Sequence, residues 1–154
     1  MKNTTTHLQR LEEIGFRKSG DWLLSSEGKI QVKLNDISRT TNALYTFVLD
    51  GEVVYIGKTT QHLRKRLYGY QNPKGTQATN LRGRDEILSS LIKGHKIEVF
   101  VLPDNGLFRF GGFHLNLAAG LEDSLINDIR PRWNKRFGSE DAKAKARALK
   151  DTST

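Results

Sequence analysis

The chain has 154 residues, enough for one compact domain and too few for two sizeable cores. It contains no cysteine, which excludes disulfides, thiolate metal sites and a cysteine nucleophile. Lysine and arginine number 25 against 17 acidic residues, a formal charge of +8, and this excess favours a polyanionic partner, nucleic acid above all. Because no apolar run approaches the roughly 20 residues that span a bilayer and the start resembles no signal peptide, we expect a soluble, cytoplasmic protein without membrane contact.

The first forty residues predict a helix followed by a β-hairpin. Apolar residues recur at helical spacing from Leu8 to Ile14. Residues 21–24 and 29–34 then form two β-prone runs on either side of a polar turn, and the second run alternates apolar and polar side chains. We expect this segment to pack on the main domain.

The strongest local signal is a second hairpin, centred on Asp50-Gly51. The flanking residues 44–49 and 52–57 are β-prone, and Asp-Gly suits a type I′ turn because both central residues of that turn need positive φ. Pairing the two strands about this turn brings Tyr45 and Tyr55 close together across the sheet.

Helices and one more strand are predicted after the hairpin. A basic segment follows Gly57, and a helix there places Arg66 and Tyr70 on one face, four residues apart. A polar loop over 71–81 leads into a helix that ends at Gly94, and 97–102 predicts a strand.

The last predicted core element is a helix over 117–129, which ends before Pro131. Placing its residues 100° apart puts Glu122 inside the apolar arc and Asp123 outside it. Because an unpaired buried charge costs several kcal/mol, Glu122 needs a cation, a metal or strong donors. A structural ion pair at the edge of the arc is the alternative explanation.

Several of these residues resemble the motif of the GIY-YIG nucleases, over about residues 43–135. Ala43-Leu44-Tyr45 stands where Gly-Ile-Tyr is usual, and Tyr55-Ile56-Gly57 matches the second half of the motif. The further matching points are Lys58, Arg66, Glu122 and the segment Pro131-Arg132-Trp133-Asn134, which resembles the family's terminal Pro-x-x-Asn. Tyr70 resembles a tyrosine of excision-repair incision enzymes, where homing enzymes of the family carry histidine.

The resemblance implies an α+β fold: a small, mainly antiparallel three-stranded sheet flanked by helices, here with an N-terminal helix and β-hairpin extension. We therefore expect three segments. Residues 1–40 form the extension, 41–137 a GIY-YIG-like nuclease domain, and 138–154 a charged tail that is either helical or disordered.

The resemblance also implies a metal-dependent DNA endonuclease that hydrolyses phosphodiester bonds. The expected cofactor is Mg²⁺ or Mn²⁺, held by Glu122, because a carboxylate is the hard oxygen ligand that magnesium prefers. A single carboxylate favours a single metal ion. The expected catalytic residues are Tyr45, Tyr55, Lys58, Arg66, Tyr70, Glu122 and Asn134.

The chemistry suggests a division of labour among these residues. Arg66 suits a phosphate clamp, and Lys58 a point charge near the nucleophile. A tyrosine base is demanding, since lowering a pKa from about 10 to about 7 takes roughly 4 kcal/mol. Family members differ in which motif tyrosine has this role; we favour Tyr55, with Tyr45 orienting water or phosphate. The residues expected to contact nucleic acid are Arg64, Lys65, Gln77, Asn80, Arg82 and Arg84.

Three biological readings stay open at this point. The protein could be a restriction-type enzyme, with a homodimer as one way to cut two strands. It could equally be a nicking nuclease of repair or of a mobile element. The alternative from another class is a catalytically inactive nucleic-acid-binding module with the same fold.

Overall fold

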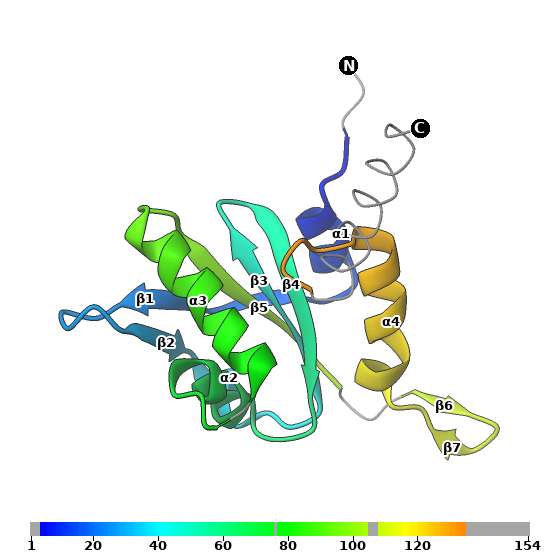
Figure 1. Ribbon diagram of the computed structural model, residues 1–154. Coiled ribbons are helices and arrows are strands. Elements are labelled where there is room, and N and C mark those ends of the chain that lie inside the picture. The colour runs from blue at the N-terminus through cyan, green and yellow to red at the C-terminus, as the bar shows by residue number, and fades with distance from the viewer. Residues whose placement is uncertain (1–3, 76, 105–107, 135–154) are drawn as a thin grey trace, which may run out of the picture.

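The computed structural model describes residues 4–75, 77–104 and 108–134, which form an α+β fold around a five-stranded antiparallel sheet (Figure 1). The strand order in the sheet is β2-β1-β5-β3-β4. The strands are β1 (Arg17–Leu24), β2 (Ile30–Leu34), β3 (Ala43–Leu49), β4 (Glu52–Thr59) and β5 (Ile97–Pro103). The helices are α1 (His7–Glu13), the short 3-10 helix η1 (Asp36–Arg39), α2 (Leu63–Gln71), α3 (Ala78–Ile92) and α4 (Leu117–Ile129). A separate small hairpin consists of β6 (Arg109–Phe110) and β7 (Phe113–His114).

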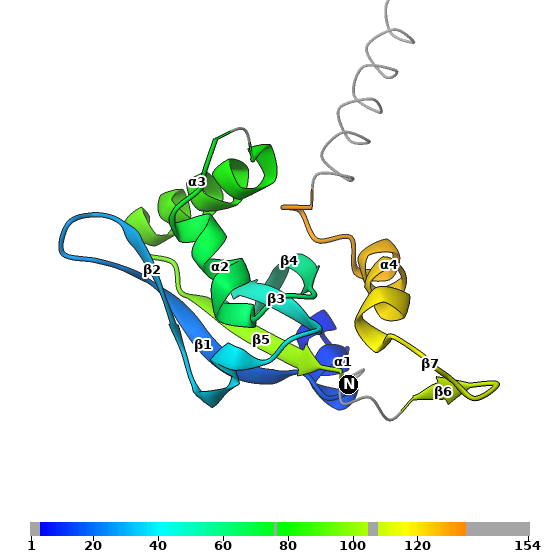
Figure 2. The same ribbon diagram turned by 90° about the horizontal axis from the view of Figure 1, so that it is seen from below.

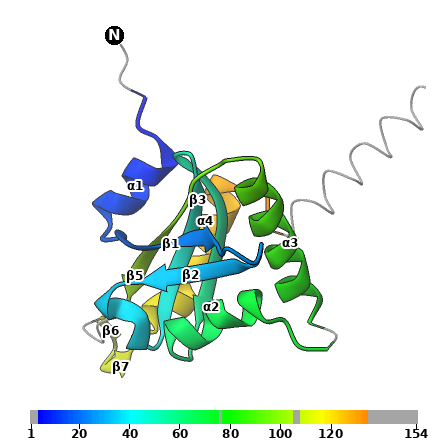
Figure 3. The ribbon, with the colours of Figure 1, turned by 90° about the vertical axis from the view of Figure 1, so that its left-hand side faces the viewer.

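The predicted three-stranded sheet is too small. The N-terminal helix and hairpin are present, but the hairpin joins the main sheet because β1 pairs antiparallel with β5, from Arg17 opposite Val101 to Trp22 opposite Ile97 (Figure 3). This pairing joins strands that lie far apart in the sequence, and no local sequence pattern predicts which strands pair. The predicted tail over 138–154 lies outside the described residues, and the division into an extension and a nuclease domain stays a prediction.

The β3–β4 hairpin has the predicted turn. Asp50 and Gly51 both have positive φ, 47° and 89°, as a type I′ turn requires. β3 lies between β5 and β4, and every one of its residues is buried. Its alternating side chains therefore fill two different cores.

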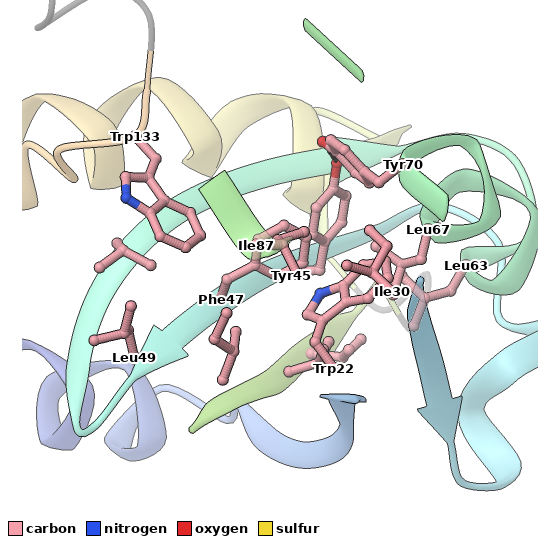
Figure 4. Packing of buried hydrophobic residues seen from close by; sticks show 14 of the residues in the cluster. Trp22, Ile30, Tyr45, Phe47, Leu49, Leu63, Leu67, Tyr70, Ile87 and Trp133 are labelled. Carbon is pink, nitrogen blue, oxygen red and sulfur yellow. Dashed lines mark hydrogen bonds between the residues drawn. The ribbon is translucent and has the colours of Figure 1, made fainter. Parts of the chain in front are cut away.

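The helices cover the two faces of the sheet. α2 and α3 lie on one side of β3 and β4, and α4 lies on the other (Figures 1 and 2). The first core contains Tyr45 and Phe47 with Leu67 from α2 and Ile87 from α3 (Figure 4). The second core contains Leu44, Val48 and Ile56 of the sheet with Leu11 of α1 and Ile126 of α4. The alternation along β3 thus directs Tyr45 toward α2 and α3.

Candidate active site

Three tyrosine hydroxyls meet on the face of the sheet that α2 covers. In the β3–β4 register Tyr45 lies opposite Gly57 and Phe47 opposite Tyr55, so the two motif tyrosines are diagonal neighbours with ring centroids 6.1 Å apart. Tyr70 approaches them from α2. Its hydroxyl lies 2.9 Å from the Tyr45 hydroxyl and donates to the Tyr55 hydroxyl at 3.2 Å. Figure 4 shows the Tyr45 and Tyr70 rings reaching toward each other. The predicted proximity of Tyr45 and Tyr55 is confirmed, and Tyr70 links them.

Two glycines make room for this cluster. A Cβ atom at Gly57 would lie 2.6 Å from both the phenol carbon and the oxygen of Tyr45. A Cβ atom at Gly83, in α3, would lie 2.6 Å from the Tyr70 ring. Such approaches are too short for carbon atoms, so the glycine of the Tyr55-Ile56-Gly57 motif serves the close packing of Tyr45 against β4.

Arg66 binds this cluster from the preceding turn of α2. Its Nη2 donates to the Tyr70 hydroxyl at 2.9 Å, and its guanidinium carbon lies 4.5 Å from the centroid of the Tyr70 ring. Its Nη1 donates to Oδ1 of Asn80 at 2.9 Å, and Nδ2 of Asn80 donates to Oε1 of Gln77 at 2.7 Å. The two amides of α3 and its N-cap therefore fix the direction of the guanidinium.

Solvent reaches the three tyrosines unequally. Tyr45 and Tyr70 are buried, with 0% and 1% exposure, whereas Tyr55 is partly exposed. Burial raises the pKa of Tyr45 and of Tyr70 far above its usual range, because a phenolate loses its hydration there. Both stay protonated at neutral pH, and Tyr55 is the member of the cluster that an outside molecule can meet.

Lys58 and Glu122 form a second group at the same strand. Lys58 follows Ile56 by two residues on β4, so it shares the face of the sheet that α4 covers. Glu122 lies in the middle of α4 and is partly buried. Burial raises the pKa of its carboxyl group, and the charge of Lys58 opposes this shift. Glu122 thus occupies the apolar side of α4, as predicted, and Lys58 is the cation that faces it.

The segment after α4 closes the outer edge of β4. Asn134 is buried; its Oδ1 accepts from the backbone N–H of Ile56 at 3.1 Å, and its Nδ2 donates to the Ile56 carbonyl at 2.9 Å. The N–H of Trp133 donates to the carbonyl of Val54 at 2.9 Å. Arg82 of α3 donates to the Trp133 carbonyl at 2.6 Å. Residues 131–134, called the strap below, therefore connect the end of α4 to α3 and to β4, the strand that carries Tyr55.

These contacts bear on the expected role of three predicted residues. Asn134 binds Ile56 through both its amide oxygen and its amide nitrogen, so it positions β4, and its predicted catalytic role stays a prediction. Asn80 was expected to contact nucleic acid, but it is buried and engaged with Arg66 and Gln77. Arg82 donates one N–H to the Trp133 carbonyl and is exposed, so its predicted contact with nucleic acid stays a prediction.

The remaining predicted contact residues lie on α2 and α3: Arg64 and Lys65 are in α2, Gln77 is the N-cap of α3, and Arg84 is within α3. Arg64 and Lys65 are exposed and line a shallow depression of about 690 Å³ together with Arg39, His62 and Tyr68. Gln77 is exposed, and Arg84 lies 3.4 Å from Asp85. Of the predicted contact residues, the exposed cations Arg64 and Lys65 therefore give α2 a basic outer face.

A cavity of about 190 Å³ adjoins the tyrosine cluster. Tyr55, Tyr70, Gly83 and Trp133 contribute to its walls, and Arg82 and Glu86 add charged groups. Sequence reasoning missed this cavity and the grip of Asn80 on Arg66. The sequence shows only that Asn80 lies in the first turn of a predicted helix, and a surface residue is equally common at that position.

The geometry thus yields two groups of predicted residues. Tyr45, Tyr55, Tyr70 and Arg66 form one hydrogen-bonded cluster, and Glu122 faces Lys58 on the other face of β4. We expect one substrate to reach both groups across β4. Within residues 4–75, 77–104 and 108–134 no three His, Asp or Glu side chains gather as a metal-binding cluster, and no helix there is long and apolar enough to cross a membrane.

Comparison with known proteins identifies a structural relative. No family model matches the sequence, and no curated protein matches it. The structure of a bacteriophage T4 EndoII mutant with a glutamate replaced by alanine matches with a TM-score of 0.66 and 25% sequence identity, over 85% of this chain and 99% of that one. The restriction endonuclease HPY188I, in complex with product DNA, matches with a TM-score of 0.48 and 16% identity, over 84% of each chain. The likeness to T4 EndoII supports a nuclease fold.

Proposed function

We propose that this chain is a metal-dependent DNA endonuclease that hydrolyses phosphodiester bonds at the strand β4. One observation carries the proposal: the hydroxyl of Tyr55, a partly exposed residue, accepts a hydrogen bond from Tyr70, which Arg66 also binds. A proton acceptor is thereby held beside a cation that suits a phosphate. The nuclease fold shared with T4 EndoII supports the same reading.

Tyr55 is the proposed general base. It would take a proton from the attacking water, which requires its phenolate to be stabilised. Tyr70 is placed to do this, because a donated hydrogen bond favours the charged form of the acceptor. The Tyr45 hydroxyl lies 2.9 Å from the Tyr70 hydroxyl and supports it. Because Tyr45 is fully buried, we do not assign it the role of orienting water or phosphate that the sequence suggested.

Arg66 is the proposed ligand of the phosphate beside Tyr55, and Lys58 is the proposed cation beside Glu122 on the other face of β4. Arg66 offers a planar donor fork that Asn80 and Tyr70 already orient, so little side-chain freedom is lost when a phosphate binds. Lys58 is exposed on β4 and supplies a mobile point charge. The cations Arg64 and Lys65 extend this positive surface along α2 and would follow the nucleic-acid backbone.

Glu122 fits the proposed metal ion. Its carboxylate offers the hard oxygen that Mg²⁺ or Mn²⁺ prefers, and it is partly exposed, so water and phosphate oxygens can complete the coordination. When bound, the ion supplies charge stabilisation at the phosphoryl oxygens. A single carboxylate is in keeping with one ion. Restriction-type cutting and repair or mobile-element nicking are both compatible with this site.

Plasmid cleavage tests the proposal. Purified protein is incubated with supercoiled plasmid, with Mg²⁺ or with a chelator, and the variant Arg66→Ala is assayed alongside. We expect nicked or linear products that need the metal ion and that Arg66→Ala reduces at least about 100-fold, as for loss of a transition-state phosphate contact. DNA binding without cleavage under every metal condition would instead favour the inactive nucleic-acid-binding module.

A further inference from the structure

The hairpin β6–β7 carries an apolar face that nothing in the described structure covers. It projects away from the sheet beyond α4 (Figure 1). Gly111 and Gly112 form its turn with φ of 59° and 82°, Arg109 pairs with His114, and Phe110 pairs with Phe113.

The register sorts the side chains by chemistry. In an antiparallel hairpin, pairs that are two positions apart share a face. Phe108 and Leu115, joined by a backbone hydrogen bond of 2.8 Å, therefore lie on the same face as Phe110 and Phe113. Arg109 and His114 lie on the opposite face, where His114 approaches the buried carboxylate of Asp104 at 3.8 Å. One face is thus wholly apolar and the other polar.

The apolar face is large for an exposed surface. Its four side chains are 49%, 82%, 80% and 46% exposed, for Phe108, Phe110, Phe113 and Leu115. With roughly 200 Å² for each aromatic side chain, the face presents on the order of 500 Å² of apolar surface. Patches of that size on a single chain commonly mark an interaction site.

We propose that this face binds the same face of a second copy of the chain, related by a two-fold axis. Two such faces packed together would bury roughly 1,000 Å², which reaches the lower limit of specific protein interfaces. An isologous contact pairs the same patch of both copies, so each apolar face would pack on apolar side chains.

Other occupants fit less well. Nucleic acid binds mainly through cations on phosphates, and Arg109, the cationic side chain of the hairpin, lies on its other face. The chain's own residues beyond 134 include only Phe137 and Leu149 as large apolar side chains, too few to cover four. The proposal does not depend on the proposed nuclease activity, because it is tested by the oligomeric state of the chain in solution.

Sedimentation velocity of the full chain at micromolar concentrations tests this interface. We expect a dimer for the wild type, a monomer for the double variant Phe110→Glu with Phe113→Glu, and a dimer for the matched control Ile92→Glu, which changes another exposed apolar side chain. Circular dichroism checks that all three are folded. A monomeric wild type, or a dimeric double variant, would overturn the proposal. So would a double variant that keeps the wild-type mass and loses DNA affinity, since the face would then be a nucleic-acid surface.

A cross-link supplies a second, independent test. Because the chain has no cysteine, Phe113→Cys introduces a single thiol. Mild oxidation should join two copies of this variant and leave Lys93→Cys, at the end of α3, largely uncoupled. A dimer that cross-links no better through position 113 than through position 93 would place the interface elsewhere and refute the proposal.

Discussion

The hydroxyl of Tyr70 lies 3.2 Å from the hydroxyl of Tyr55 and donates to it. Tyr70 is buried and Tyr55 is partly exposed, so a buried donor binds a residue that solvent also reaches. Tyr70 in turn is held by Tyr45 and Arg66, each at 2.9 Å. The hydroxyl of Tyr55 is therefore held by Tyr70, and Tyr70 by residues that a substrate need not touch.

Removing the Tyr70 hydroxyl should slow cleavage without unfolding the protein. Hydrogen bonds to charged groups contribute about 1.5–3 kcal/mol, so Tyr70→Phe should reduce the rate roughly 10- to 100-fold. Tyr68→Phe, at an exposed position of the same helix, is the control. A wild-type rate for Tyr70→Phe would refute the supporting role.

Asn80 should act as a positioning residue for Arg66. Asn80→Ala leaves Nη1 of Arg66 without its acceptor, and we expect single-turnover cleavage to fall about 10-fold. Asn80→Asp keeps an acceptor oxygen and should restore most of the rate. Equal loss in the two variants, measured with matched thermal stability, would show that Arg66 does not need this acceptor.

Alkaline titration should separate the four tyrosines. Burial raises the pKa of Tyr45 and Tyr70 above the ordinary value of about 10, so both should stay protonated in the folded protein when an exposed tyrosine ionises. The unfolded chain then loses these protons first, and stability is full below about pH 10 and falls above it, by about 1.4 kcal/mol per pH unit for each tyrosine. Phenolate absorbance and urea unfolding measured at rising pH test this. Full ionisation near pH 10 before any unfolding would contradict the burial of the pair.

The strap after α4 should matter for stability. Asn134→Ala removes two hydrogen bonds and leaves the N–H and carbonyl of Ile56 unpaired, so we expect a loss of about 2–3 kcal/mol in the free energy of unfolding. Asn127→Ala, at an exposed position of α4, should change stability far less. Urea denaturation measures both. If Asn134→Ala were as stable as Asn127→Ala, the strap would not hold β4.

Local patterns predicted the parts of the fold that depend on neighbours in sequence. The Asp50-Gly51 turn, the common face of Arg66 and Tyr70, and α4 with its half-buried Glu122 all follow from short-range rules. The pairing of β1 with β5 does not, because it depends on contacts between distant segments. For the same reason the sequence predicted Asn80 at the surface, although its side chain is buried and accepts a hydrogen bond from Arg66 of α2.

The carboxylate of Glu122 carries the central claim, because it should hold the metal ion of the proposed reaction. The most direct measurement is the rate of Mg²⁺-dependent plasmid cleavage by Glu122→Gln beside Asp123→Asn, which removes the neighbouring carboxylate from the exposed side of the same helix. We predict at least a 100-fold lower rate for Glu122→Gln and a nearly unchanged rate for Asp123→Asn, with both variants folded. Equal cleavage by the wild type and Glu122→Gln would contradict the account.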